Sequence, residues 1–440
     1  MKAPDDMTGK MRSISPMDIA HSFHLDHPEI DSLPAPCGQA CTLKLGPERH
    51  SMLELGRLAR FAIMIEPAGR GTFSEQAAEL FAQLYCIVCC RETGLTPTAM
   101  MVFLREAANK DRCRRVIAAV FGDKAPVTTY VAQPPCSGAE LGVELWAAGG
   151  EGVEIRRHGA HAISVESEGI RWVHCGDVRG DLDRVESAYD EAATAFRHLD
   201  EQLGLAGVDF GQVLRTWIYV NQITEGPDGR QRYQELNRAR TDYFDGVKLC
   251  GKNRVAWAPD KIYPASTGIG TQGTGITLCA MALDTERDDV FFIPLENPRQ
   301  TSAFEYNSSY SPKTPKFSRA MAVVQGHFVS TFVSGTASIV EAKTVHVGDV
   351  ERQTEQTIDN IERLIAAENF AGHNMPGVGA ELTDVAKLRV YVKHAEDYEK
   401  CRNIVEEKLP DVPAIYLHAD VCRPDLLVEI EAVAFSPLKA

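Results

Sequence analysis

Features that would direct this 440-residue chain to a membrane or a nucleic acid are missing from its sequence. It contains no run of about 18 apolar residues, so no membrane-spanning helix is expected. Lys and Arg number 46 against 61 Asp and Glu, and the formal net charge of -15 argues against a nucleic-acid or anionic-membrane surface. Residues 1–40 are polar and lack an apolar signal-peptide core. We therefore expect a cytoplasmic protein whose partner is a small molecule.

The sequence also lacks the spacing that metal and phosphate sites need. Its 12 cysteines are scattered, and only Cys86, Cys89 and Cys90 cluster. A zinc site would require a second pair of ligands, so free buried thiols are the simpler interpretation. The glycine-rich residues 268–275 have no strand–loop–helix context and predict no phosphate loop. We expect neither a metal nor another cofactor.

What the sequence does contain is an internal repeat. Residues 98–122 and 385–410 share one pattern, in which an alternating apolar strand leads into an amphipathic helix with a Cys-Arg pair. A more diverged copy lies between them, with its strand at residues 215–223 and its helix at 233–244. The closing strands match as well, and they align Tyr130 with Tyr416, Cys136 with Cys422, and Glu144 with Glu429. In the middle copy, Thr277 stands at the position of Glu144 and Glu429.

Each copy predicts strands, a helix, one strand, a second helix and closing strands. The first helices are expected to begin near Gln76, Arg184 and Val350. This order predicts α+β modules with helices on one face of a mixed sheet. Gly149-Gly150 and the ENP at residues 296–298 mark boundaries. The expected organisation is a polar tail at residues 1–40 followed by modules at 41–150, 151–295 and 296–440.

The third copy resembles the RidA/YjgF family. The resemblance rests on Val412, Pro413 and Ala414 followed by the closing strand VEIEA at residues 428–432. That family forms homotrimers with ligand pockets between subunits. Three copies in one chain therefore imply an intramolecular pseudo-trimer, and we expect the protein to be a monomer.

Two departures separate the chain from the imine-hydrolysing members of that family. They carry an Arg after Val-Pro-Ala, where this chain has Ile415, and a Tyr-Ser-Gln segment, where it has residues 317–319, FSR. An enamine or imine deaminase is therefore a weakened alternative. A ligand-binding protein of the same fold without catalytic activity is a second alternative.

Three further segments are similar to chorismatases, which are RidA-like enzymes that remove pyruvate from chorismate. These segments are residues 296–320, 334–339 and 419–432. The resemblance covers the second and third copies and implies that the first is an additional N-terminal module. It also implies that chorismate is the substrate.

Releasing pyruvate from chorismate requires a proton at the methylene carbon of its enolpyruvyl ether. A buried carboxylic acid can remain protonated near neutral pH and supply that proton. Glu429 is our candidate, because the resemblance places the first Glu of VEIEA in the interface pocket. From the alternating pattern alone, Glu429 and Glu431 would equally fit a solvated strand face.

Two residues bear on the product. In relatives that form 3-hydroxybenzoate a Cys occupies the position of Cys422 and shapes the pocket, and relatives that hydrolyse chorismate to a diol carry Ala at the position of Gly335. We therefore predict 3-hydroxybenzoate as the product, with Gly335 leaving room for the substrate ring.

The two carboxylates of chorismate call for arginines. The second module supplies Arg215, Arg238 and Arg240, and Arg215 is taken as a candidate. The other candidates for substrate binding all belong to the third module, and they are Arg299, Gln300, Tyr310, Arg319, Arg389 and Arg402.

Overall fold

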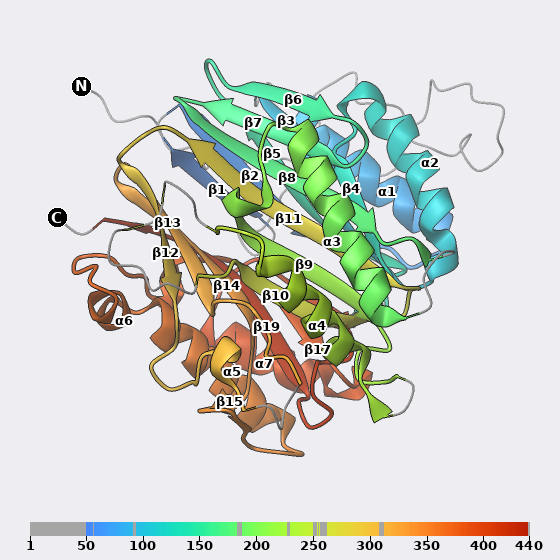
Figure 1. Ribbon diagram of the computed structural model, residues 1–440. Helices are drawn as coiled ribbons and strands as arrows, with labels where there is room; N and C mark the ends of the chain where they lie inside the picture. Colours follow the sequence, from blue (N-terminus) through green and yellow to red (C-terminus); the bar gives the residue numbers. More distant parts are fainter. Residues whose placement is uncertain are drawn as a thin grey trace.

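The computed structural model describes most of the chain beyond its polar start, and three β-sheets dominate it (Figure 1). Residues 1–40 and Tyr310 lie outside the described residues. The described ranges are 50–55, 57–90, 94–182, 187–226, 229–249, 253, 255, 262–307 and 312–438.

The first sheet has the strand order β1-β2-β5-β3-β4. Only β3 and β4 run parallel to each other, and every other neighbouring pair is antiparallel. Helix α1 starts with a capping box between Thr72 and Glu75, in which each side chain accepts from the other residue's backbone N–H. The elements are β1 (His50–Leu55), β2 (Leu58–Ile65), α1 (Phe73–Tyr85), β3 (Leu95–Leu104), α2 (Lys110–Phe121), β4 (Val127–Val131) and β5 (Leu141–Gly149).

The second sheet has the order β10-β9-β11-β8-β7-β6, with β9 and β10 as its parallel pair. Helix α3 is capped by Ser187, which accepts from the N–H of Asp190. The elements are β6 (Glu154–His158), β7 (Ala162–Ser167), β8 (Ile170–Arg179), α3 (Ala188–Leu205), β9 (Val213–Asn221), α4 (Arg232–Phe244), β10 (Ala265–Thr271) and β11 (Ile276–Thr285).

The third sheet has the order β12-β13-β14-β19-β17-β18. Its first strand, β12, begins at Val290. The boundary expected between residues 295 and 296 therefore follows β12 in the chain instead of preceding it. The ENP segment is the loop that leaves this strand. The elements are β12 (Val290–Leu295), β13 (Ala320–Gln325), β14 (Phe328–Ala337), α5 (Val350–Ile365), α6 (Ala367–Gly372), β17 (Val385–Val392), α7 (Tyr398–Lys408), β18 (Ala414–His418) and β19 (Val428–Pro437), with a small hairpin of β15 (Ile339–Val340) and β16 (Lys343–Thr344) beside them.

The same succession of elements recurs in the three sheets. Antiparallel strands, two in the first sheet and three in each of the others, lead to a helix, a further strand, a second helix and a strand parallel to that further strand. The last strand then inserts into the middle of the sheet, as β5, β11 and β19 do. The predicted mixed α+β architecture is confirmed, and α5 begins at Val350 as expected.

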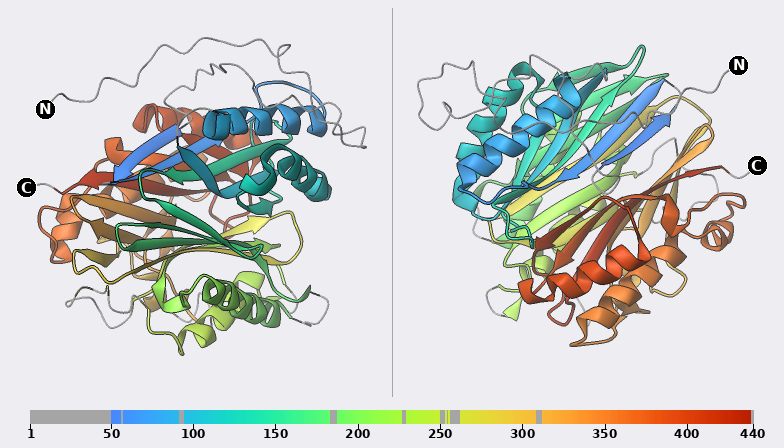
Figure 2. Two further views of the ribbon diagram at one scale, coloured as in Figure 1. Left: turned by 90° about the horizontal axis from the view of Figure 1, so that it is seen from above. Right: turned by 180° about the vertical axis from the view of Figure 1, so that it is seen from behind.

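The sheets turn one face toward the centre of the molecule, and the helices lie on the outside (Figure 2). Each sheet packs its outer face on its own helices. The inner faces share one apolar core, to which Phe103, Trp172, Tyr219, Phe332 and Tyr391 contribute. Among the described residues, no helix is long and apolar enough to span a membrane.

Candidate active site

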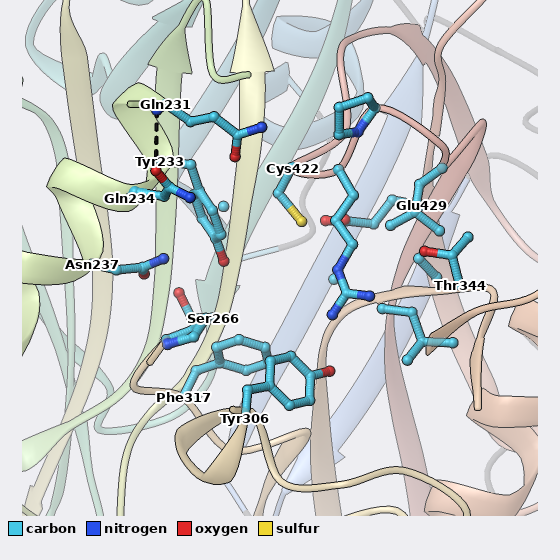
Figure 3. A pocket seen from close by; sticks show the side chains of 18 of the residues that line it. Gln231, Tyr233, Gln234, Asn237, Ser266, Tyr306, Phe317, Thr344, Cys422 and Glu429 are labelled. Atoms are coloured by element: carbon cyan, nitrogen blue, oxygen red, sulfur yellow. Dashed lines mark hydrogen bonds between the residues drawn. The ribbon is translucent and has the colours of Figure 1, made fainter. Parts of the chain in front are cut away.

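A cavity of about 550 Å³ opens between the second and third sheets. Helix α4 and strand β10 form one wall, and strands β14 and β19 with the loop before β19 form the other (Figure 3). The side chains that carry chemistry in this lining are Tyr233, Asn237, Arg240, Ser266, Tyr306, Arg319, Lys343, Cys422, Arg423, Asp425 and Glu429.

Glu429 is the second residue of β19, and its carboxyl group faces the cavity (Figure 3). Only 4% of this residue is exposed. Burial and, second, the neighbouring carboxylate of Glu431 raise the pKa of Glu429 to about 8, although Arg215 and Arg319 oppose the rise. The carboxyl group is therefore protonated at neutral pH and can donate a proton.

Glu431, two residues further along the strand, has the opposite character. Its carboxylate forms ion pairs with Arg215 (2.9 Å) and Arg389 (3.0 Å), and it accepts hydrogen bonds from Trp217 Nε1 (2.9 Å) and Thr267 Oγ1 (2.5 Å). These cations and donors lower the pKa of Glu431 although burial opposes them. Glu431 is thus a permanent anion beside a neutral acid.

Arg319 lies in the cavity wall and is 3% exposed. Its Nη2 donates to the carbonyl oxygen of Thr301 (3.0 Å) and to the hydroxyl of Tyr306 (2.6 Å). Its Nε is buried and has no hydrogen-bond partner among the described residues. A buried cation with an unused donor is suited to bind an anionic group.

Arg240 on α4 has the same character, although the sequence singled it out only as one of three arginines in the second module. It is 2% exposed, its Nη2 donates to Asn237 Oδ1 (2.6 Å), and its Nε finds no partner in the described part of the chain. Tyr233, Asn237 and Arg240 follow one another at helical spacing, which puts them on one face of α4. That spacing is the signal by which the sequence could have identified this wall.

Gly335 and Cys422 both line the cavity, as predicted. A β-carbon added to Gly335 would overlap the carboxyl group of Glu429 and lie 2.9 Å from its Cδ. The space beside Gly335 is therefore occupied by the carboxyl group of Glu429, and that this glycine also leaves room for the substrate ring stays a prediction. Burial raises the pKa of Cys422 to about 12, so its thiol is a neutral part of the cavity wall and no thiolate nucleophile.

Two of the predicted arginines lie away from the cavity. Arg299 is on the surface and pairs with Asp359 at 3.1 Å. Arg402, on α7, pairs with Glu406 at 2.7 Å. Both are ordinary surface ion pairs, which contribute little to stability and offer no site.

The remaining candidates lie behind the cavity or outside the described residues. Arg215 and Arg389 belong to the buried ion pairs around Glu431. Gln300 donates to the carbonyl oxygen of Ile339 (2.8 Å) and so supports a lining residue without reaching the cavity itself. Tyr310 falls among the residues that the structure does not describe.

Strand register identifies the counterparts of Glu429 in the other two sheets. Glu429 lies across from the aromatic residue near the end of β17, Tyr391. The residues that lie across from Tyr219 and Phe103 are Thr277 and Gly142. Neither counterpart can act as an acid.

Glu144 does not correspond to Glu429, contrary to the sequence comparison. It lies across from Met101, as Glu431 lies across from Arg389. The loop that leads into β5 is shorter than the sequence comparison assumed, so the match was displaced by two residues. Glu144 is the counterpart of the paired Glu431.

At the junction of the first and second sheets, Asp177 takes the place of Gly335. Its backbone N–H donates to Thr129 Oγ1 (2.9 Å) as that of Gly335 donates to Thr267 Oγ1 (3.0 Å). The carboxylate of Asp177 pairs with Lys110 at 2.9 Å. The ion pair of Asp177 and Lys110 therefore occupies the place that corresponds to the acid Glu429 at the junction of the second and third sheets.

Family models match two parts of the chain. Residues 144–282 match the family described as chorismatase FkbO/Hyg5-like, N-terminal, and residues 311–436 match the family described as endoribonuclease L-PSP. The RidA-type module that accompanies the chorismatase N-terminal domain therefore follows it in the chain. The expectation of an additional module in front of a two-module enzyme is wrong in this respect.

A solved chorismatase supports the same correction. The chain has the fold of that crystal structure at a TM-score of 0.60 and 24% identity, over 87% of this chain and 100% of the other. The second and third modules as predicted hold only 290 of the 440 residues. The shared fold must therefore extend into the first sheet.

Curated relatives match at higher identity. A 3-hydroxybenzoate synthase of Streptomyces hygroscopicus is 33% identical over 308 residues, which are 67% of this chain and 82% of that protein. A chorismatase of Streptomyces rapamycinicus is 35% identical over 66% of this chain and 81% of that protein. On this similarity, the chain belongs to the chorismatase family.

Proposed function

We propose that this protein is a chorismatase that converts chorismate to 3-hydroxybenzoate and pyruvate, with Glu429 as the general acid. One observation carries the proposal: a buried carboxyl group with a pKa raised to about 8 faces a cavity with unused arginine donors. The names of the curated relatives support the substrate and the product.

The reaction begins when protonated Glu429 delivers its proton to the terminal methylene carbon of the enolpyruvyl ether. The ether carbon becomes an oxocarbenium-like centre, and Glu429 becomes a carboxylate. The oxygen of the hydroxyl group at ring position C4, in place of water, then bonds to ring carbon C3 as the C3–O bond to the pyruvate unit breaks. Pyruvate leaves with the ether oxygen as its carbonyl, and the 3,4-epoxide that remains on the ring opens by cleavage of its C4–O bond, which leaves the hydroxyl group on C3. The ring loses a proton as it becomes aromatic, and Glu429 can recover one. No water is consumed, since 3-hydroxybenzoic acid and pyruvic acid together contain the atoms of chorismic acid.

The cavity offers a cation for each carboxylate of the substrate. Arg319 precedes β13 of the third sheet, Arg240 lies on α4 beside the second sheet, and the Nε of each has no hydrogen-bond partner among the residues that the structure describes. Holding the substrate at two points orients the methylene carbon toward Glu429 and favours attack from within the molecule. Tyr233 and Asn237 add polar contacts on the α4 side.

Incubation of the protein with chorismate, followed by chromatography, tests the proposal. We expect pyruvate and 3-hydroxybenzoate in equal amounts. Formation of the dihydroxycyclohexadiene acid instead would preserve the family reaction but refute the product. Absence of pyruvate, together with turnover of 2-aminoacrylate, would favour an imine deaminase. Tight binding of chorismate without turnover would favour the non-catalytic alternative.

We also propose that the three sheets are three RidA-like modules closed into a pseudo-trimer within one chain. The recurring connection order, the matching registers and the shared inner core support this arrangement. The module boundaries then lie near residues 150 and 290. Light scattering is expected to give the mass of one chain, because closure within the chain leaves no open interface. A stable assembly of three chains would contradict it.

A further inference from the structure

We propose that Glu144, in the first sheet, is a positioning residue for the acid Glu429 and acts through Arg389 and Glu431. The inference rests on the proposed function. It gives the first sheet a part in the reaction although none of its residues lines the cavity. Its basis is a continuous chain of buried ionic contacts from one sheet to the other.

Glu144 sits in the middle of β5 and is 0% exposed. Its two carboxylate oxygens contact different cations of β17, Lys387 Nζ at 2.8 Å and Arg389 Nε at 2.6 Å. Trp146 Nε1 donates a further hydrogen bond to it at 2.6 Å. These cations lower the pKa of Glu144 far below its usual range, so it is an anion at every working pH.

Arg389 joins Glu144 to the active site. Its Nε pairs with Glu144, while its Nη1 pairs with Glu431 at 3.0 Å and donates to the hydroxyl of Tyr219 at 3.2 Å. The guanidinium group is 1% exposed and is thus shared between two carboxylates. Because Glu144 neutralises part of the positive charge of Arg389, Arg389 compensates the Glu431 carboxylate less completely. The negative charge of Glu431 therefore acts more strongly on Glu429.

The acid is surrounded by groups from several elements. Those that act on it are Glu431 on its own strand, Arg215 on β9, Arg319 ahead of β13, Tyr233 on α4 and Cys422 in the preceding loop. Other charged residues line the same cavity, and they are Arg240, Lys343, Arg423 and Asp425. Among the charges that act on Glu429, Glu431 opposes its ionisation, whereas Arg215 and Arg319 favour it. The balance that keeps Glu429 protonated is therefore sensitive to whatever compensates Glu431.

This arrangement predicts opposite effects for two neighbouring substitutions. Glu144→Gln removes a buried negative charge and leaves Arg389 free to neutralise Glu431, so the alkaline limb of the activity profile shifts to lower pH. Lys387→Met removes a buried positive charge from the same cluster, so the limb shifts to higher pH. Each shift is expected to be roughly 0.5–1 pH unit for a charge in a poorly screened interior.

The test compares pH profiles of kcat/KM for wild type, Glu144→Gln, Lys387→Met and the double variant, which is expected to return toward the wild-type profile. Glu144→Asp keeps the charge and is expected to rescue the limb. Glu140→Gln is the matched control, since Glu140 lies near the surface beside the same sheet and pairs with Arg105 at 3.9 Å. The double variant also covers the case in which Glu144→Gln fails to fold, because it removes both charges together.

A second readout is independent of turnover. The infrared C=O stretch of the protonated carboxyl group, identified by its loss in Glu429→Gln, is titrated in each variant. If chorismate is not turned over but the pH at which this band titrates still shifts in opposite directions in Glu144→Gln and Lys387→Met, the positioning inference stands and the proposed function fails. Equal shifts in both single variants, or no shift in either, would overturn the inference and leave Glu144 with a structural role.

Discussion

Two glutamates, two residues apart on one strand, have opposite protonation states in this protein. Glu431 has two arginines and two neutral donors around its oxygens, and these repay the cost of burying a charge. Glu429 forms no ion pair with any described residue, so its burial favours the neutral form. The environment of each carboxyl group, and not its residue type, therefore decides which one is the acid.

Replacing Glu429 with Gln tests the acid directly. The amide keeps the shape of the side chain but cannot donate an acidic proton, so pyruvate release is expected to fall by roughly a hundredfold or more. Circular dichroism and thermal unfolding serve as the check that the fold is retained. Wild-type turnover in Glu429→Gln would show that another group delivers the proton.

The same carboxyl group predicts how stability depends on pH. Its folded pKa of about 8 lies above the ordinary value of 4.5, so the folded state binds the proton more tightly than the unfolded state. The resulting stabilisation is present below pH 4.5 and is lost as the pH rises to 8, at up to about 1.4 kcal/mol per pH unit. Urea unfolding at several pH values is expected to show this loss in wild type. In Glu429→Gln the slope over that window should be smaller, and an unchanged slope would contradict the raised pKa.

Gly335→Ala is expected to move the acid. The new methyl group would overlap the Glu429 carboxyl group and lie 3.2 Å from Thr267 Cγ2, so the glutamate must change its rotamer. We expect slower turnover and a larger share of hydrolysis product, because the proton is no longer delivered from the same point. Chromatography of the products measures both, with Gly372→Ala as the control for the substitution itself, because a β-carbon on Gly372 would meet nothing within 4 Å. An unchanged rate and product ratio would show that Gly335 does not determine the position of the Glu429 carboxyl group.

At the scale of elements, helix α4 supplies one wall of the cavity from the second sheet, while β19 supplies the acid from the third. Arg240→Lys keeps the charge but loses the planar set of donors. We expect KM for chorismate to rise about tenfold to a hundredfold, with a smaller change in kcat. Arg238→Lys is the matched control on the same helix, since Arg238 pairs with Glu235 at 2.6 Å and is partly exposed. Equal effects of the two variants would mean that Arg240 does not contact the substrate.

At the scale of the whole molecule, three similar junctions yield one site with an acid. Asp177 and its ion pair occupy one of the other junctions. At the remaining one, Ile415 Cδ1 lies 2.7 Å from where a β-carbon on Gly142 would be, so an isoleucine fills the space. Calorimetry of Glu429→Gln with chorismate is therefore expected to give one bound molecule per chain. A stoichiometry of two or three would show that the other junctions also bind it.

The sequence by itself determined the repeat, the α+β order of elements and the family. Strand alternation and helical periodicity are local, and the segments around Gly335, Cys422 and Glu429 are specific enough to identify the pocket. Sequence spacing failed where a loop changed length, and so it matched Glu144 to Glu429 instead of Glu431. It also included Arg299, which lies in the matched segment at residues 296–320, among the substrate-binding candidates, although this arginine pairs with Asp359 on the surface.

Only the tertiary structure decided which charges meet. Arg240 and Arg319 are far apart in sequence and reach the same cavity because β10 of the second sheet packs beside β14 of the third. Burial and long-range ion pairs set the protonation states of Glu429 and Glu431, and neither property can be read from neighbouring residues. The physical reason is that the free energy of a charge depends on its surroundings in three dimensions, whereas sequence patterns report the local backbone and the side of an element that is buried.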